Sequence, residues 1–253
     1  MSQANVSSKA RIGSNVKIGD FTVIHDNVEI GDDTIIESNC TIGYPCKYAE
    51  GKPLVIGANS HIRSHSIFYE GSTFGARLLT GHHAFARENC MVGKNLQLGT
   101  SAVLDGYSTI GDYVRLHSLV TIAEDAEIGN FVYILPRTQS LNDPFPPSMI
   151  RRGIKIGEMS VISAGCLLYP GAEIGVGCFV AGGSHVKLKI KNLSCVAGMP
   201  AKEFASLEKY IHPEFGPFHP WIKRMMTKYP EESHAEIERS IARIDRLMRE
   251  SRG

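Results

Sequence analysis

The chain has 253 residues, of which 43% are hydrophobic and 21% charged, and its formal net charge is +1. These values allow a sizeable core and argue against a nucleic acid or an anionic membrane as the main partner. No apolar run approaches the roughly 20 residues that a membrane span needs, and the N-terminal MSQANVSSKA lacks the features of a signal peptide. We therefore expect a cytoplasmic protein with reduced thiols.

A bulky apolar residue recurs every six positions from Ile12 to Val186, interrupted twice. Of the 26 positions in this frame, 24 are bulky and apolar, and the exceptions are the neighbours Thr80 and Ala86. Neither a helix nor an alternating strand has a period of six, so the repeat predicts an all-β solenoid of stacked coils with these positions facing inward. Asparagine often lies three residues before the inward position, as at Asn15, Asn27, Asn39, Asn59, Asn89 and Asn95. Asparagine tolerates the positive φ that a corner between short strands needs.

Two interruptions, at 44–55 and 135–155, are rich in proline and have no strand or helix period. Long loops in a compact domain are often functional, so both are candidate walls of a site, although they could equally be tolerated insertions. The solenoid domain with these two insertions is expected to span 1–204.

The remaining residues, 205–253, are expected to form a small α-helical C-terminal segment. A short helix is predicted at about 221–229, after a stretch with four prolines. Ser233 and Glu236 form a capping-box pattern. Beyond it, one face of an amphipathic helix is apolar, which favours packing against a coil or a neighbouring subunit, at Ile237, Ile241, Ile244 and Met248.

If one coil takes 18 residues, residues 18 apart stack at about 4.8 Å. This arrangement predicts three polar columns, namely His65–His83–Ser101, Glu70–Glu88 and Arg87–Asp105. Stacked carboxylates such as Glu70 and Glu88 repel unless a cation or a donor intervenes, and an amino sugar could supply that cation.

The hexapeptide pattern over about 11–204 resembles the left-handed parallel β-helix acyltransferases. Four stretches resemble the nucleotide-sugar N-acyltransferases, and most closely the branch that acetylates dTDP-3-amino-3,6-dideoxyhexoses: GANSHIRSHSIFYEGSTFG, TGHHAFARENCMVG, LNDPFPPS and VAGMPAK. In the last stretch, Met199 stands where the wider family usually has asparagine, which puts one coenzyme contact in doubt. The resemblance implies a homotrimer without a metal that transfers an acetyl group from acetyl-CoA to a sugar amine for surface-glycan synthesis.

Acyl transfer to an amine requires that the amine lose a proton, be aimed at the thioester and have the developing oxyanion stabilised. The resemblance assigns positioning roles to Glu88 and Asn89, and the stacking argument adds Asp105 to this catalytic set. His83 or His82 could be the base because imidazole titrates near neutral pH, but the departing coenzyme A sulfur could accept the proton instead. Residues expected on the substrate side are His82, Arg87, Asn142 and Asp143.

On the coenzyme side, small residues stack 18 apart and would leave a groove for the pantetheine arm, at Ala164 with Gly182 and at Gly165 with Gly183. Lys202 is expected to meet the coenzyme phosphates. Three lysines alternate along one strand, namely Lys187, Lys189 and Lys191. They either contact the coenzyme phosphates together with Lys202 or prevent pairing of an exposed strand edge with another strand.

Three other functions stay open. The first is an acyl-carrier-protein-dependent sugar O-acyltransferase of the lipid A type. The second is a zinc hydratase of the γ-carbonic-anhydrase type, for which His82 and His117 are spaced suggestively but Ile122 replaces the histidine needed five residues after His117. The third is a non-enzymatic β-helix that only assembles.

Overall fold

The computed structural model describes residues 3–251, which form a left-handed parallel β-helix with a C-terminal segment along one side. The solenoid has three sheets, A, B and C, joined by short corners, as the repeat predicts. Partner residues in successive coils are 18 apart where no insertion intervenes, as in the pairing of Phe68 with Ala86.

Sheet A has ten strands: β1 Asn5–Val6, β4 Val23–Ile24, β7 Thr41–Tyr44, β10 Ile67–Tyr69, β13 Phe85–Ala86, β16 Val103–Leu104, β19 Thr121–Ile122, β22 Gln139–Ser140, β25 Leu167–Leu168 and β28 His185–Val186. Sheet B has nine: β2 Arg11–Ile12, β5 Val28–Ile30, β8 Leu54–Ile56, β11 Thr73–Phe74, β14 Met91–Val92, β17 Thr109–Ile110, β20 Glu127–Ile128, β23 Lys155–Ile156 and β26 Glu173–Ile174.

Sheet C has eleven: β3 Lys17–Ile18, β6 Ile35–Ile36, β9 His61–Ile62, β12 Leu79–Thr80, β15 Gln97–Leu98, β18 Arg115–Leu116, β21 Tyr133–Ile134, β24 Val161–Ile162, β27 Phe179–Val180, β29 Ser194–Ala197 and β30 Lys202–Ser206. All neighbours in the three sheets run parallel except β30, which turns back antiparallel to β29 and ends the solenoid.

The inward positions form one continuous core along the solenoid axis. The two small inward residues are explained by packing. Ala86 stacks directly on the fully buried ring of Phe68, so a small side chain lies over a large one. Thr80 is buried because its hydroxyl accepts the backbone N–H of Arg63 at 2.8 Å. The reduced size of these positions is therefore compatible with core packing.

The corners need a residue with positive φ, and many residue types occupy that place. Five of the six predicted asparagines have φ near +60°, whereas Asn27 does not, because it is used differently. Its Nδ2 donates to the carbonyl oxygen of Gly51 in the first insertion, at 3.0 Å.

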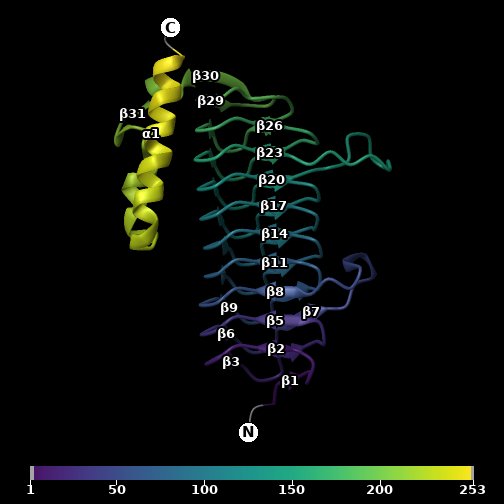
Figure 1. The fold of residues 1–253 in the computed structure, drawn as a ribbon. Helices are drawn as coiled ribbons and strands as arrows, with labels where there is room; N and C mark the ends of the chain where they lie inside the picture. The colour runs from purple at the N-terminus through teal and green to yellow at the C-terminus, as the bar shows by residue number, and fades with distance from the viewer. Residues whose placement is uncertain (1–2, 252–253) are drawn as a thin grey trace.

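The first insertion lies between β7 and β8 and contains a 3₁₀ helix, η1 Lys47–Ala49. The second lies between β22 and β23 and is shorter than the predicted break at 135–155, because β22 continues the repeat within that range. Ser140 takes the inward position there, and its hydroxyl accepts the backbone N–H of Ala123, so an apolar pattern could not reveal it. Both insertions project from the same side of the solenoid (Figure 1).

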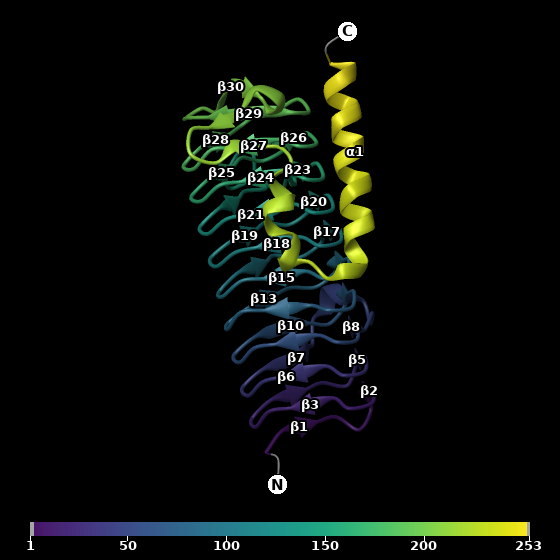
Figure 2. The same cartoon turned by 90° about the vertical axis from the view of Figure 1, so that its left-hand side faces the viewer.

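The C-terminal segment comprises η2 Leu207–Lys209, the hairpin β31 Ile211–His212 and β32 Gly216–Pro217, η3 Trp221–Lys228, η4 Glu231–Ser233 and α1 His234–Glu250. It runs back along the solenoid and covers the upper part of sheet C (Figure 2). The predicted apolar face of α1 is confirmed, since Ile237, Ile241 and Ile244 are buried against the coils. The predicted capping box is wrong: the hydroxyl of Ser233 donates to the carbonyl oxygen of Pro230 and makes no cap bond to α1.

Candidate functional site at the corner between sheets A and B

The three corners of the coil differ in chemistry. We call them AB, BC and CA after the sheets they join; in one middle coil they are 87–90, 93–96 and 81–84. The first residue of the BC corner after sheet B is glycine in every coil from Gly13 to Gly175. A Cβ there would meet the next coil, as at Gly57, where it would lie 2.4 Å from the backbone nitrogen of Ala76. The equivalent AB positions are chemically varied: His25, Gly43, Tyr69, Arg87, Asp105, Ala123, Leu141, Tyr169 and Lys187.

Glu88 is fully buried at the AB corner, and its charge is balanced within the chain. Arg87 donates two hydrogen bonds to it, from Nη2 to Oε1 at 2.9 Å and from Nε to Oε2 at 3.3 Å. The same guanidinium lies 3.5 Å from Asp105 and 3.5 Å from Glu124. Burial alone would lower the pKa of Arg87, but the bonds to Glu88 and the two further carboxylates raise it above its ordinary value. The guanidinium therefore stays charged at the centre of an acidic cluster.

The first insertion starts from the AB corner two coils below Glu88 and reaches this corner through Asn89. Asn89 donates from Nδ2 to the carbonyl oxygen of Tyr48 at 2.8 Å, and its buried Oδ1 has no partner among the described residues. Glu70 accepts the backbone N–H of Cys46 at 2.9 Å. The stacked carboxylates Glu70 and Glu88 thus each have donors from the protein, Cys46 and Arg87 respectively, so the compensating groups come from the chain and no amino sugar is needed for this purpose.

The second insertion is tied to the same corner from above through Glu124. Arg151 pairs with Glu124 at 3.1 Å, and the side-chain amide of Asn142 donates to the same carboxylate at 3.4 Å. Asp143 instead closes its own loop by accepting bonds from Ser148, which lower the pKa of this carboxyl. Asn142 thus lies with the Arg87 cluster, whereas the carboxylate of Asp143 is engaged within the insertion.

Glu124 is the residue of this cluster that the sequence interpretation missed. Its signal was present in the sequence, because Glu70, Glu88, Gly106, Glu124 and Asn142 are spaced by 18 and form one column. Only the lower two members had been recognised as a stack. Because Gly106 has no side chain, the arginine can reach from Glu88 to Glu124 across the intervening coil.

The predicted histidines lie at a different corner. His65 and His83 stack as predicted, with ring centroids 4.9 Å apart and planes 15° apart. They belong to the CA corner, on the other side of β13 from Glu88. His82 lies beside His83, with Nδ1 2.9 Å from Oγ of Ser64. In one chain, therefore, the proposed catalytic set is divided between the two edges of sheet A.

The small residues predicted for the coenzyme also lie at the CA corner, several coils above the histidines. The N–H of Gly183 donates to the carbonyl oxygen of Ala164 at 2.9 Å, which confirms the stacking of these two coils. Gly165 and Gly183 both have φ near +69°, and a Cβ on either would meet nothing within 4 Å. Gly182 next to them is exposed. A side chain at Gly165 or Gly183 would therefore extend into open space.

The lysines have separate surroundings. Lys202 is exposed on β30. Lys187 lies over the ring of Tyr169, Lys189 pairs with Glu173 at 3.1 Å and Lys191 pairs with Glu203 at 3.3 Å. These three side chains therefore do not form one free basic patch.

Within residues 3–251, no group of three or more His, Cys, Asp or Glu side chains is arranged to hold a metal ion. No helix in the same range is long and apolar enough to cross a membrane.

Comparisons with known proteins agree with the solenoid. Residues 9–44 match the family described as bacterial transferase hexapeptide (six repeats). The fold is similar to that of Arabidopsis UDP-N-acetylglucosamine acyltransferase, with a TM-score of 0.67 and 16% identity, over 81% of this chain and 73% of that chain. It is also similar to UDP-N-acetylglucosamine O-acyltransferase from Moraxella catarrhalis RH4, with a TM-score of 0.52 and 13% identity, over 97% and 96% of the two chains. No curated protein sequence matches the chain. At these identities the likeness establishes the fold and leaves the substrate open.

Proposed function

We propose that this protein is an acyltransferase that moves an acetyl group from acetyl-CoA to the amine of a dTDP-linked 3-amino-3,6-dideoxyhexose. The observation that carries the proposal is the AB corner, where an arginine and three carboxylates lie between two insertions. A cluster whose side chains are fixed by ion pairs, with one acid left accessible, can hold a substrate in a fixed orientation, which is the main requirement for attack on an activated thioester. The similar acyltransferases act on a sugar nucleotide according to their names, which also supports the substrate class.

Within this cluster, Asp105 is the acid best placed to meet the amine. Its side chain is 42% exposed, whereas Glu88 is fully buried and paired with Arg87. Asp105 would accept a hydrogen bond from the amine and orient its lone pair toward the thioester carbon. Attack forms the C–N bond and a tetrahedral oxyanion; the C–S bond then breaks and the coenzyme leaves as its thiolate. The proton lost by nitrogen passes to that sulfur or to His83. Glu88 and Glu124 would keep Arg87 in position, and Asn89 would hold the first insertion.

A homotrimer would bring the two halves of the predicted site together. The outward side of sheet A carries an apolar stripe in the middle coils, formed by Ile67, Phe85 and Val103, with Val23 and Leu167 as further apolar residues toward the two ends. The outward side of sheet B instead carries ion pairs such as Lys155–Glu127 and Lys189–Glu173. If three copies pack through sheet A, the CA corner of one copy meets the AB corner of the next. His82, His83 and the Ala164–Gly183 groove would then face Glu88 and Asp105 of a neighbouring copy.

The cellular setting proposed here is the cytoplasm, with a product that feeds surface-glycan synthesis. All six cysteines are free thiols, which supports a reducing compartment. Burial raises the pKa of Cys90 to about 11 and that of Cys195 to about 12, so these thiols are core residues and not nucleophiles.

The decisive experiment is a screen of nucleotide-linked amino sugars with acetyl-CoA and the purified protein, following free thiol release and the mass of the product. We expect acetylation of one or more dTDP-linked 3-amino sugars. The absence of product with every amino sugar, while the folded protein still binds coenzyme A, would overturn the choice of acceptor.

The similarity to a sugar-nucleotide O-acyltransferase favours a second candidate, acyl transfer from an acyl carrier protein to a sugar hydroxyl. Turnover with acetyl-CoA in the absence of any carrier protein supports the first candidate. Turnover that requires an acyl carrier protein and a UDP-linked sugar hydroxyl supports the second.

A further inference from the structure

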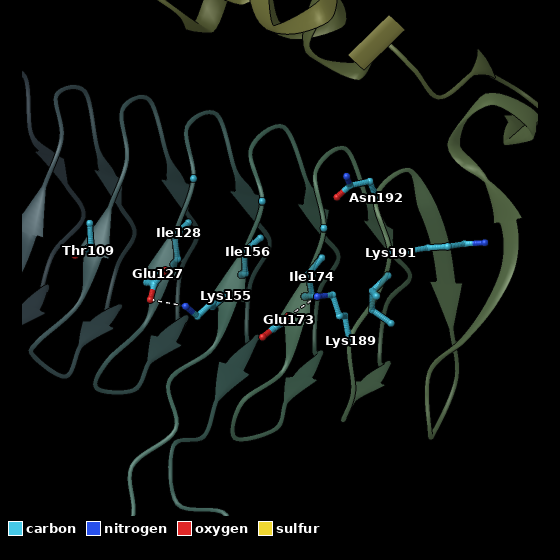
Figure 3. A pocket seen from close by; sticks show the side chains of 14 residues that line it. Thr109, Glu127, Ile128, Lys155, Ile156, Glu173, Ile174, Lys189, Lys191 and Asn192 are labelled. Carbon is cyan, nitrogen blue, oxygen red and sulfur yellow. Dashed lines mark ion pairs between the residues drawn. The ribbon is translucent and has the colours of Figure 1, made fainter. Parts of the chain in front are cut away.

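A hollow of about 880 Å³ lies along sheet B in the upper coils, and its charged side chains are already paired. Its side chains alternate between acids and lysines that pair with one another, as Figure 3 shows for Lys155 with Glu127 and Lys189 with Glu173. A face whose charges cancel in this way offers no unpaired group to a charged ligand.

A smaller hollow at the CA corner has the opposite character. It measures about 230 Å³ and lies between the coils of β9 and β18. Its wall contains an arginine, two histidines, hydroxyls and a carboxamide but no carboxylate: Arg63, Leu79, Thr80, Gly81, His82, Gln97, Gly99, Thr100, His117 and Ser118.

The hollow exists because of two glycines in one column. Arg63, Gly81, Gly99 and His117 occupy equivalent corner positions in four successive coils. The two missing side chains leave a gap between the arginine below and the histidine above, whose backbone positions are three coil spacings, roughly 14 Å, apart. A Cβ on Gly81 would lie 2.3 Å from the backbone nitrogen of Thr100, so a larger residue cannot fill the gap without moving the coil.

Three nitrogen groups around the gap have no partner among the described residues. The guanidinium of Arg63 makes no ion pair or hydrogen bond within 3–251. His82 uses Nδ1 toward the hydroxyl of Ser64, at 2.9 Å, which leaves Nε2 unpaired. His117 uses Nε2 toward the hydroxyl of Tyr133, at 2.7 Å, which leaves Nδ1 unpaired. In each imidazole a hydroxyl that donates to one nitrogen makes the other nitrogen an N–H donor.

The nearest acid does not compete for these donors. Glu37 lies 3.9 Å from Nδ1 of His82, on the side away from the free Nε2. Its oxygens already accept bonds from Nε2 of His61 at 2.9 Å and from the backbone N–H of Ser64 at 3.0 Å. Glu37 is therefore a support for the ring of His82 and forms no part of the wall of the hollow.

We propose that this CA-corner hollow is a binding site for a phosphoryl group, held by Arg63 from below, by His117 from above and by His82 and the hydroxyls of Thr100 and Ser118 along its side. A cationic fork, N–H donors, hydroxyls and the absence of carboxylates are what an oxyanion of this size requires. The site lies on the same corner as His83, below the proposed coenzyme groove. The proposal does not depend on which reaction the protein catalyses, because its test measures binding alone.

The test uses the full chain and inorganic pyrophosphate as the probe, with binding followed by isothermal titration calorimetry at fixed ionic strength. Arg63→Gln should weaken binding by about tenfold or more, since it removes one charge-assisted partner of the anion. The matched control is Arg137→Gln, which removes an exposed arginine from the same corner outside the hollow. Its affinity should stay within about twofold of the original chain.

Competition then distinguishes the possible sources of the phosphoryl group. Displacement of pyrophosphate by dTDP and not by coenzyme A supports a site for the nucleotide sugar, and the reverse supports a site for the coenzyme. Displacement by neither supports a site for free phosphate. Equal affinities for the Arg63 and Arg137 variants, or no binding by the original chain, would overturn the proposal whatever the enzyme catalyses.

Discussion

Arg87 lies at the centre of the AB corner, because its guanidinium is within 3.5 Å of the carboxylates of Glu88, Asp105 and Glu124. A buried carboxylate is retained only when it is paired and hydrogen-bonded, and Glu88 meets both conditions through Arg87. The acids of this corner therefore have different roles. Glu88 maintains the cluster, and Asp105 remains exposed enough to meet a substrate.

Two substitutions separate these roles. Glu88→Gln should lower both stability, by about 3 kcal/mol, and kcat/KM, because it leaves the half-buried Arg87 without its closest partner. Asp105→Asn should leave the melting temperature nearly unchanged and lower kcat/KM by about tenfold or more. Thermal unfolding and steady-state kinetics measure the two effects, with Asp125→Asn as the control at the same corner. Full activity of Asp105→Asn would remove Asp105 from the mechanism.

His83 decides how the amine loses its proton. It is exposed and stacked on His65, and a corner residue with φ of 57° can be replaced by asparagine with little strain. His83→Asn should retain substantial activity if the coenzyme sulfur accepts the proton. A fall in kcat on the order of 10⁴-fold, with binding of both substrates intact, would instead identify His83 as the general base.

At the scale of elements, the C-terminal segment contributes packing to the solenoid and no side chain to the AB corner. Its apolar residues cover the upper part of the BC corner, where they pack against Tyr113, Phe131 and Met159. Trp221 fixes the position of η3 by donating from its ring nitrogen to the carbonyl oxygen of Met159 at 2.9 Å. The segment is therefore attached along the edge of the solenoid that lies opposite sheet A.

His219 makes this attachment sensitive to pH. Its side chain is 8% exposed, and burial lowers its pKa below the ordinary value of 6.5 although Asp245 lies 3.0 Å away. As the pH falls below about 6.5, the unfolded histidine binds a proton more readily than the folded one, so stability is lost. Between about pH 7.5 and about pH 5.5 the melting temperature should fall, and α1 should exchange its amide hydrogens faster.

The control for this prediction is the change of melting temperature with pH in two variants. His219→Gln should flatten the dependence, whatever it does to stability at neutral pH, whereas His212→Gln in the same segment should keep it. An unchanged slope in His219→Gln would show that another group is responsible.

At the scale of the whole molecule, the outward faces of the three sheets have different environments. Sheet C is covered in its upper part by the C-terminal segment, sheet B carries ion pairs, and the apolar side chains of sheet A lack a cover from the described chain. An apolar stripe along a rigid solenoid suits association with copies of itself.

Phe85→Glu should dissociate the proposed trimer, because it places a charge in the middle of this stripe next to Tyr69. Sedimentation velocity should then report a monomer with retained circular dichroism, and acetyl transfer should fall with the loss of the shared site. Thr109→Glu adds the same charge to the outward face of sheet B and should leave the assembly unchanged. A trimer that survives Phe85→Glu would place the interface elsewhere.

Much of the fold was accessible from the sequence because a period of six has only one structural explanation. The stacking of His65 on His83 and of Arg87 on Asp105 followed from the 18-residue coil alone. The extension of the repeat to β22 did not, because Ser140 is polar and satisfies its hydroxyl only in the folded coil. The role of Glu124 also escaped notice, because its partner Arg151 lies on an insertion without any period.

Periodicity therefore determined the coil, its inward residues and the columns, since each of these depends on local spacing. Only the tertiary structure decided which corner each column occupies and which donors neutralise each acid. It placed the histidines and Glu88 at opposite edges of sheet A, and it directed both insertions to the same corner. The physical reason is that contacts between an insertion and a distant coil depend on how the chain folds back in space. Such contacts follow no fixed spacing in the sequence, so periodicity cannot predict them.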